Sequence, residues 1–156
     1  MLFRSPRTTA AHETAPSLIS LETQIRDHPA HALTPARAEL LRAMVAHRLP
    51  EGRIKVDHPH KINSIAACAF RNAVPFTVHP GIGYDIIANH PMFRGAVIGR
   101  AADIDFRLLG ASVDKLDDGV VLSIGSAIMA PQVFEKGLSC VNNLRIQAGR
   151  KIVSGH

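Results

Sequence analysis

Hydrophobic residues recur with helical spacing in five segments of this chain, residues 17–27, 34–49, 62–70, 97–116 and 131–148. In each segment the apolar residues gather on one face, as in a helix that packs one side against a core. Ser17 is a typical N-cap, and Thr34 is an N-cap followed by a proline at the first helical position. The pattern therefore predicts a chain rich in amphipathic helices.

Two short apolar runs predict β-strands instead. Phe76 to Val78 and Val120 to Ile124 are rich in aromatic or β-branched residues, and glycines follow both runs. Since a helix-length segment separates the runs, they predict a βαβα unit with parallel strands and a right-handed crossover. The expected fold class is thus α/β, a parallel sheet with flanking helices.

The loops that follow these strands form the candidate site. Carboxyl ends of parallel strands share one edge of a sheet, where α/β proteins hold their ligands. Four positions are expected to cradle a nucleotide or anionic ligand, and they are Gly81, Gly83, Gly125 and Ser126. Three side chains are the candidate catalytic groups, and they are His79, Asp85 and His90. The alternative is a pair of tight turns that bind nothing.

A second hypothesis comes from the histidines. His58 and His60, together with His79 and Asp85, supply ligand types of a metal-dependent hydrolase. No H-E-x-x-H helix, G-x-G-x-x-G run or Walker A lysine is present, so no specific metal or nucleotide motif supports either hypothesis. The remaining acidic residues are expected to be solvated or to form a helix end and turn, and they are Asp103, Asp105, Asp114, Asp117 and Asp118.

Composition narrows the class of protein. With 156 residues, 46% of them hydrophobic and 20% charged, the chain has the profile of a globular, cytoplasmic protein without a membrane span or secretory signal. The net charge of +5 is scattered and accompanied by few aromatic residues, so nucleic-acid binding is not expected. Cys68 and Cys140 form neither a disulfide framework nor a zinc spacing.

The ends of the chain differ from its middle. Residues 1–16 lack periodicity and are expected to form an irregular tail, of which residues 1–5 match the product of a ligated adapter. Residues 17–156 are expected to form a partial α/β domain. Because Lys151 begins what looks like another strand or loop, the chain is expected to be an internal fragment.

Several motifs together resemble the bacterial deoxyhypusine-synthase-like proteins, over about residues 53–150. The motifs lie at residues 63–67, 74–87, 90–91, 107–109 and 122–134. The resemblance implies a doubly wound, three-layer parallel sheet related to NAD-binding folds. It also implies NAD at the carboxyl edge of that sheet and a homo-oligomer in the full-length protein.

One departure from this family concerns the chemistry. The synthases carry a catalytic lysine shortly after their glycine run, where this chain has Ile128 to Pro131. An imine requires a primary amine, so lysine aminobutyl transfer is not expected. The sequence therefore predicts a deoxyhypusine-synthase-like protein that binds NAD or a related small molecule. Whether it is a transferase-like or NAD-dependent enzyme, or a non-catalytic oligomeric module, stays open.

Overall fold

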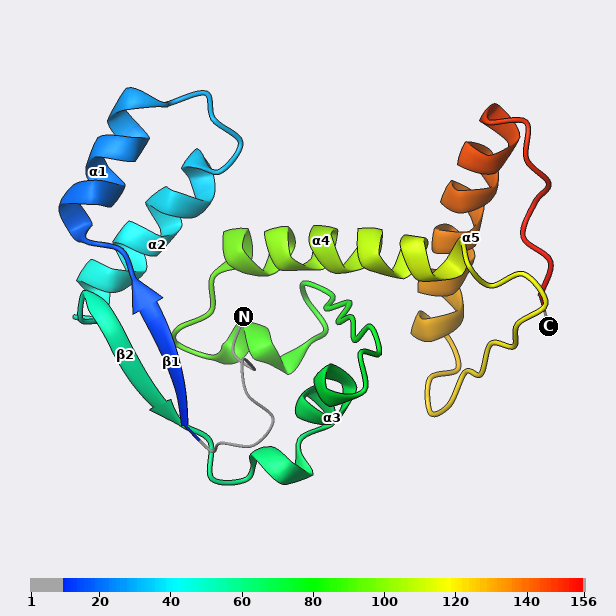
Figure 1. Ribbon diagram of the computed structural model, residues 1–156, viewed down its shortest axis with the longest axis horizontal. Coiled ribbons are helices and arrows are strands. Elements are labelled where there is room, and N and C mark those ends of the chain that lie inside the picture. The colour runs from blue at the N-terminus through cyan, green and yellow to red at the C-terminus, as the bar shows by residue number, and fades with distance from the viewer. Residues whose placement is uncertain (1–9, 156) are drawn as a thin grey trace. The chain divides into compact units, whose positions relative to one another are not determined.

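The computed structural model describes residues 10–155, with side chains from Ala15 onward (Figure 1). The chain divides after Val74 into two compact units. No helix of the described residues has both the length and the apolar character needed to cross a bilayer.

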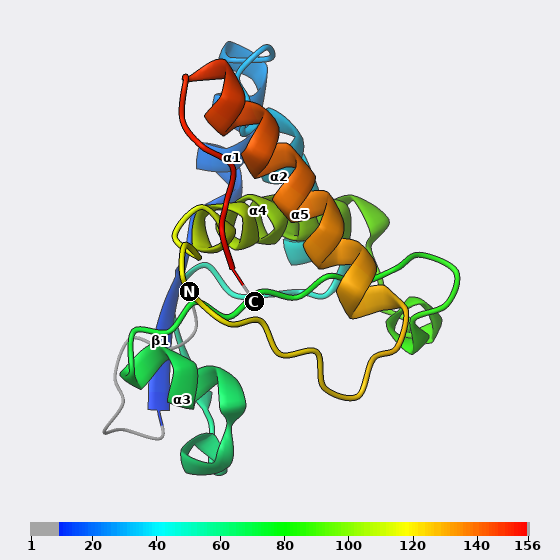
Figure 2. The ribbon, with the colours of Figure 1, turned by 90° about the vertical axis from the view of Figure 1, so that its right-hand side faces the viewer.

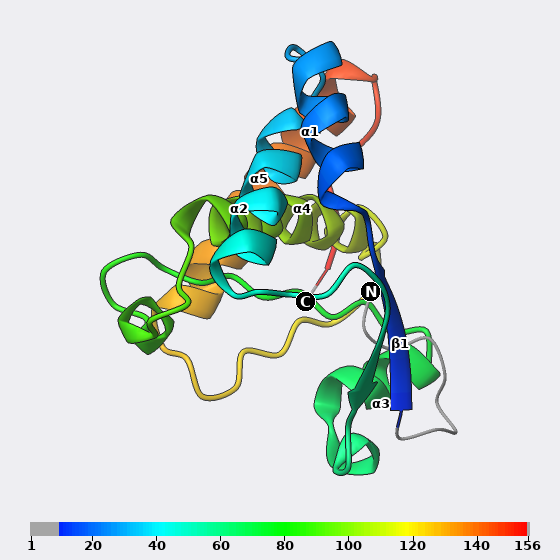
Figure 3. The ribbon, with the colours of Figure 1, turned by 90° about the vertical axis from the view of Figure 1, so that its left-hand side faces the viewer.

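The first unit combines a β-hairpin-like pair of strands with three α-helices. Its elements are β1 (Ala10–Ala15), α1 (Leu18–Asp27), α2 (Thr34–Ala46), β2 (Gly52–Asp57), the 3₁₀ turn η1 (Lys61–Asn63) and α3 (Ile65–Arg71). The two strands pair antiparallel, with Ala15 opposite Gly52. Helices α1 and α2 pack together, as Figure 3 shows, and bury Leu21 and Met44 to 3% and 2% exposure.

The helix starts follow the sequence signals. The Ser17 hydroxyl accepts a hydrogen bond from the Ser20 amide at 3.1 Å, which confirms the predicted cap of α1. Ser64 caps α3 in the same way through the Ala67 amide at 3.3 Å. In α2 the N-cap is Leu33, so Thr34 is the first helical residue rather than the cap.

The second unit is built on two long helices, α4 (Gly95–Val113) and α5 (Met129–Gln147), with the 3₁₀ turn η2 (Ile86–Asn89) before them. Gly137 lies at the contact between the two helices: a Cβ there would lie 3.7 Å from Cδ2 of Leu109, an ordinary van der Waals distance. Val113 and Val141 are buried nearby. Figure 2 shows the segment after α4 running as an irregular loop into the start of α5.

The predicted α/β fold class is wrong for the described residues, which contain no parallel sheet with flanking helices. This also removes the NAD-binding-like fold that the family resemblance implied. Residues 76–78 and 120–124 are not strands, and no backbone hydrogen bond joins either segment to another part of the described chain. A strand exists only when its amides and carbonyls find a partner, and an apolar run does not specify that partner. Leu122 and Ile124 are accordingly 77% and 85% exposed.

One isolated parallel β-bridge lies next to residues 120–124. It joins Gly119 to Gly155, and the Asp118 amide donates to the Ser154 carbonyl at 2.7 Å. The bridge spans α5, whereas the sequence predicted parallel pairing across the 97–116 helix. The parallel contact therefore joins the residues after α4 to the residues after α5, and tertiary contacts decide this pairing.

Two features of the first unit were not predicted. Ala10–Ala15 forms β1, although residues 1–16 were expected to be irregular; residues 1–9 lie outside the described part. Its partner β2 was missed, although Arg53 to Val56 alternates charged and apolar residues, and the apolar ones are the less exposed. This alternation is the ordinary signature of a half-buried strand.

Replacing either of two glycines in the second unit by alanine is expected to change the free energy of unfolding, in opposite directions. Gly83 has a φ of +101°, so Gly83→Ala places a side chain in strained backbone and lowers the free energy of unfolding by about 1–2 kcal/mol. Gly99 lies inside α4 with open space around it, so Gly99→Ala raises that free energy by about 0.5–1 kcal/mol. Urea unfolding of both variants measures the two changes. Shifts of the same sign would contradict the backbone conformation given to one of them.

Candidate ligand cavity at His79

A cavity of about 500 Å³ in the second unit brings together residues from the two segments that the sequence predicted as strands followed by glycine loops, both of which are irregular in the structure. Thr77 and His79 line it from the first segment, and Val121 to Ser123 line it from the second; these two irregular segments are called the first and second loop below. The remaining wall comes from α4 and from the start of α5, through Leu109, Met129 to Pro131, Val133 and Phe134. This His79 cavity is therefore mostly apolar, with three polar side chains.

The imidazole of His79 is held from two sides. Its Nε2 lies 3.0 Å from the hydroxyl oxygen of Thr77, and its ring meets that of Phe106 edge to face, with centroids 6.5 Å apart. His79 is half-buried. An imidazole positioned in this way can hydrogen-bond a ligand or transfer a proton to it.

Two aspartates hold the loop that carries His79. The carboxylate of Asp105, on α4, accepts a hydrogen bond from the Val78 amide at 2.8 Å. The carboxylate of Asp85 accepts one from the Gly81 amide and so closes the glycine turn. Asp85, predicted as a catalytic group, therefore stabilises the loop through its carboxylate, and neither it nor Gly81 and Gly83 line the His79 cavity.

His90 lies apart from His79. Its Nδ1 accepts a hydrogen bond from the Met92 amide at 3.1 Å, and its side chain lines a different cavity, next to Ile87 and Phe93. The three predicted catalytic side chains are thus not gathered in one place. Only His79 faces a cavity formed by both loops.

Gly125 and Ser126 take another role than cradling an anion. The Ser126 hydroxyl accepts a hydrogen bond from the Ala130 amide at 3.0 Å, at the start of α5. The Ser126 carbonyl accepts another from the Ser123 hydroxyl at 3.1 Å. Because these polar groups order the turn itself, neither Gly125 nor Ser126 lines the His79 cavity, whereas their neighbour Ser123 does.

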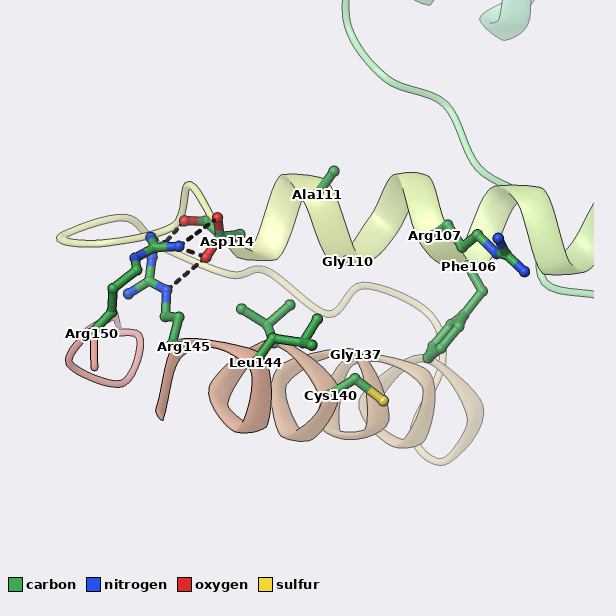
Figure 4. Close-up of a pocket in the computed structure, with 11 residues that line it drawn as sticks. Phe106, Arg107, Gly110, Ala111, Asp114, Gly137, Cys140, Leu144, Arg145 and Arg150 are labelled. Atoms are coloured by element: carbon green, nitrogen blue, oxygen red, sulfur yellow. Dashed lines mark hydrogen bonds and ion pairs between the residues drawn. The ribbon is translucent and has the colours of Figure 1, made fainter. Parts of the chain in front are cut away.

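A second cavity, of about 430 Å³, lies along the contact between α4 and α5 (Figure 4). Apolar or small side chains line most of it, among them Phe106, Gly110 and Cys140. Charged side chains stand at its ends: Arg107 at one, and Arg145 with Arg150 and Asp114 at the other.

Arg145 is a buried arginine at the centre of a network with partly exposed partners, which we name the Arg145 clamp. Its side chain is 3% exposed, its Nε donates to Asp114 Oδ1 at 2.7 Å, and its two terminal nitrogens donate to the Asp117 carboxylate at 2.9 Å each. It also donates to the backbone carbonyls of Asp114 and Lys151. Since a guanidinium has five N–H groups, all of its donors are occupied.

The clamp is balanced in charge. Hydrogen bonds from Arg145, then from the Ser154 amide, lower the pKa of Asp117 to about 2. Hydrogen bonds from Arg145 and then Arg150 lower the pKa of Asp114, and the two aspartates raise the pKa of Arg145. With every donor occupied by the protein, the clamp connects α5, the turn after α4 and the last residues rather than binding an anion.

The pKa of Asp117 gives a direct prediction. A carboxylate with a lowered pKa stabilises the fold fully above the ordinary carboxyl pKa of about 4, and this contribution is lost as the pH falls through about 2. Side-chain carbon NMR across this pH range is expected to titrate Asp117 near 2. In an Arg145→Met variant the pKa should move back toward 4, and an unchanged value would show that Arg145 is not its cause.

The sequence analysis did not identify the Arg145 clamp or the role of Asp105. Asp105, Asp114 and Asp117 were assigned no chemistry, and Arg145 was not considered. A signal was available for Arg145: it follows Gly137 and Val141 at intervals of four, and all three positions are buried on one face of α5. An arginine buried on an otherwise apolar helix face requires hydrogen-bonding partners of opposite charge.

The histidines proposed as metal ligands lie in different units, His58 and His60 in the first and His79 and Asp85 in the second. Between Ala10 and Gly155 no group of three or more His, Cys, Asp or Glu side chains lies close enough to hold a metal ion. The metal-dependent hydrolase hypothesis thus gains no support from the described residues.

Comparison of the chain with family models, curated proteins and solved structures found no match in any of the three. The resemblance to deoxyhypusine-synthase-like proteins therefore gains no support from these comparisons.

Proposed function

We propose that the second unit binds a small molecule in the His79 cavity. One observation carries the proposal: two loops more than 40 residues apart in the sequence line one cavity of about 500 Å³, and each contributes polar side chains to a mostly apolar wall. This size and composition are typical of small-molecule sites, which measure about 300–1,000 Å³.

The polar groups divide into two sets. Thr77 and His79 form a hydrogen-bonded pair on one side, and the Ser123 hydroxyl lies on the other. His79 is the only side chain of the wall with the chemistry of a general acid or base. If the ligand reacts in this cavity, His79 is the group that exchanges the proton.

Binding is tested by titrating the isotope-labelled protein with phenol at millimolar concentration and following its amide NMR signals. We expect the largest shifts at Thr77, His79 and Ser123. The cavity at His90 serves as an internal control, because it is also apolar but is formed by one continuous segment. Equal shifts in both cavities, or none at His79, would contradict the proposed function.

NAD is the second probe, since the family resemblance implies it as the cofactor. Shifts of the same three signals on addition of NAD would identify the His79 cavity as part of its site. Unchanged signals at millimolar NAD would remove this cofactor from the proposal and leave small-molecule binding as the function to be explained.

A further inference from the structure

His79 is the one titratable side chain in the wall of the His79 cavity. Its wall includes no Asp, Glu, Lys or Arg side chain. The carboxylate of Asp105, on α4, already accepts a hydrogen bond from the Val78 amide. A cation that entered the cavity would meet no carboxylate, and an anion no lysine or arginine, so neither would regain a counter-charge of that kind for the hydration it loses.

We propose that the ligand group held in this cavity is uncharged, largely apolar and equipped with an N–H or O–H donor. The inference rests on the proposed function and adds the chemical class of the ligand. Charged parts of a larger ligand remain outside the cavity.

The need for an N–H or O–H donor on the ligand follows from the hydrogen bonds of Ser123. Its hydroxyl proton is donated to the Ser126 carbonyl at 3.1 Å, so the hydroxyl oxygen can only accept a further hydrogen bond. A ligand that presents an N–H or O–H group satisfies this oxygen, whereas a carboxylate or phosphate has no proton to offer.

The turn between Ser123 and α5 argues against an anionic head in the same place. Gly125 and Ser126 were predicted to bind an anion such as phosphate, but the Ser126 hydroxyl accepts a hydrogen bond from the Ala130 amide instead. One of the free amides at the helix start, the usual partners of an anion, is thereby satisfied within the protein.

Three planar probes of nearly equal size test the inference: benzamide is neutral, benzoate is an anion and benzamidinium is a cation. Each is titrated into the intact chain while the amide signals of Thr77, His79 and Ser123 are followed. We expect benzamide to bind at least about fivefold more tightly than either ion, because only the ions lose hydration without a partner. Equal or tighter binding of benzoate or benzamidinium would overturn the inference while leaving the proposed function intact.

Ser123→Ala tests the donor. The substitution is expected to weaken benzamide binding about three- to tenfold, the usual effect of losing one hydrogen bond. Toluene has a similar shape but no donor, so its binding should not change. Equal effects on benzamide and toluene would overturn the assigned role of Ser123. If none of the probes shifts these signals, the proposed function fails together with the inference.

Discussion

Replacing Arg145 by methionine is expected to lower the thermal unfolding midpoint of the second unit by roughly 5–10 °C, the size of effect that removing a buried, fully hydrogen-bonded side chain has in a small domain. Methionine fills similar space but makes none of the hydrogen bonds that Arg145 gives to Asp114, Asp117 and the Lys151 carbonyl. The two aspartates then face each other without their main counter-charge. Calorimetry of the intact chain measures the midpoint.

Arg150 provides the matched control. It also contacts the Asp114 carboxylate, at 3.2 Å, but its side chain is 52% exposed, whereas that of Arg145 is 3% exposed. Arg150→Met should shift the midpoint by no more than about 2 °C, because exposed ion pairs contribute little. Arg145→Lys should lose most of the stability as well, since an ammonium cannot make the paired contact with Asp117. If Arg150→Met lowers the unfolding midpoint as much as Arg145→Met does, general charge balance rather than the clamp explains the effect.

The second large effect is expected from filling the His79 cavity. Ala130 contributes only a methyl group to its wall, and the amide of Ala130 that Ser126 caps is retained in any substitution except proline. Ala130→Trp should place an indole in the cavity and weaken phenol binding by more than about tenfold, because the ligand and the ring compete for the same volume. Amide NMR titration measures the loss.

Ser139→Trp is the control for this variant. Ser139 is exposed on the same helix and does not line the His79 cavity, so the new ring should leave phenol binding unchanged. Unfolding midpoints of both variants show whether α5 is intact. Retained binding in a folded Ala130→Trp variant would place the phenol site elsewhere and contradict the proposed function.

The helices were predictable because their signals are local. Ser17 caps α1 as its position indicates, and the apolar spacing before Gly149 predicted α5 to within two residues at each end. Such patterns need only residues within one or two turns of each other. The antiparallel pair of β1 and β2 joins segments about 40 residues apart, and its first strand carries no local signal.

Of the predicted site residues, only His79 lines the His79 cavity. The sequence indicated that the loops around His79 and Gly125 belong together, and Thr77, His79 and residues 121–123 do line one cavity. It gave the wrong reason, since no parallel sheet aligns the two segments in the described residues. Asp85, His90 and Ser126 were assigned to the site by their spacing, but each is engaged by a nearby backbone amide instead.

By itself, the sequence determined the helical segments, the caps and the turn-forming loops, because each depends on interactions between residues close along the chain. The tertiary structure alone decided which extended segments pair and which apolar runs stay exposed. It also joined a buried Arg145 to two unassigned, partly exposed aspartates in the Arg145 clamp. Pairing and burial depend on partners distant in sequence, and a pattern of apolar and polar residues does not name them.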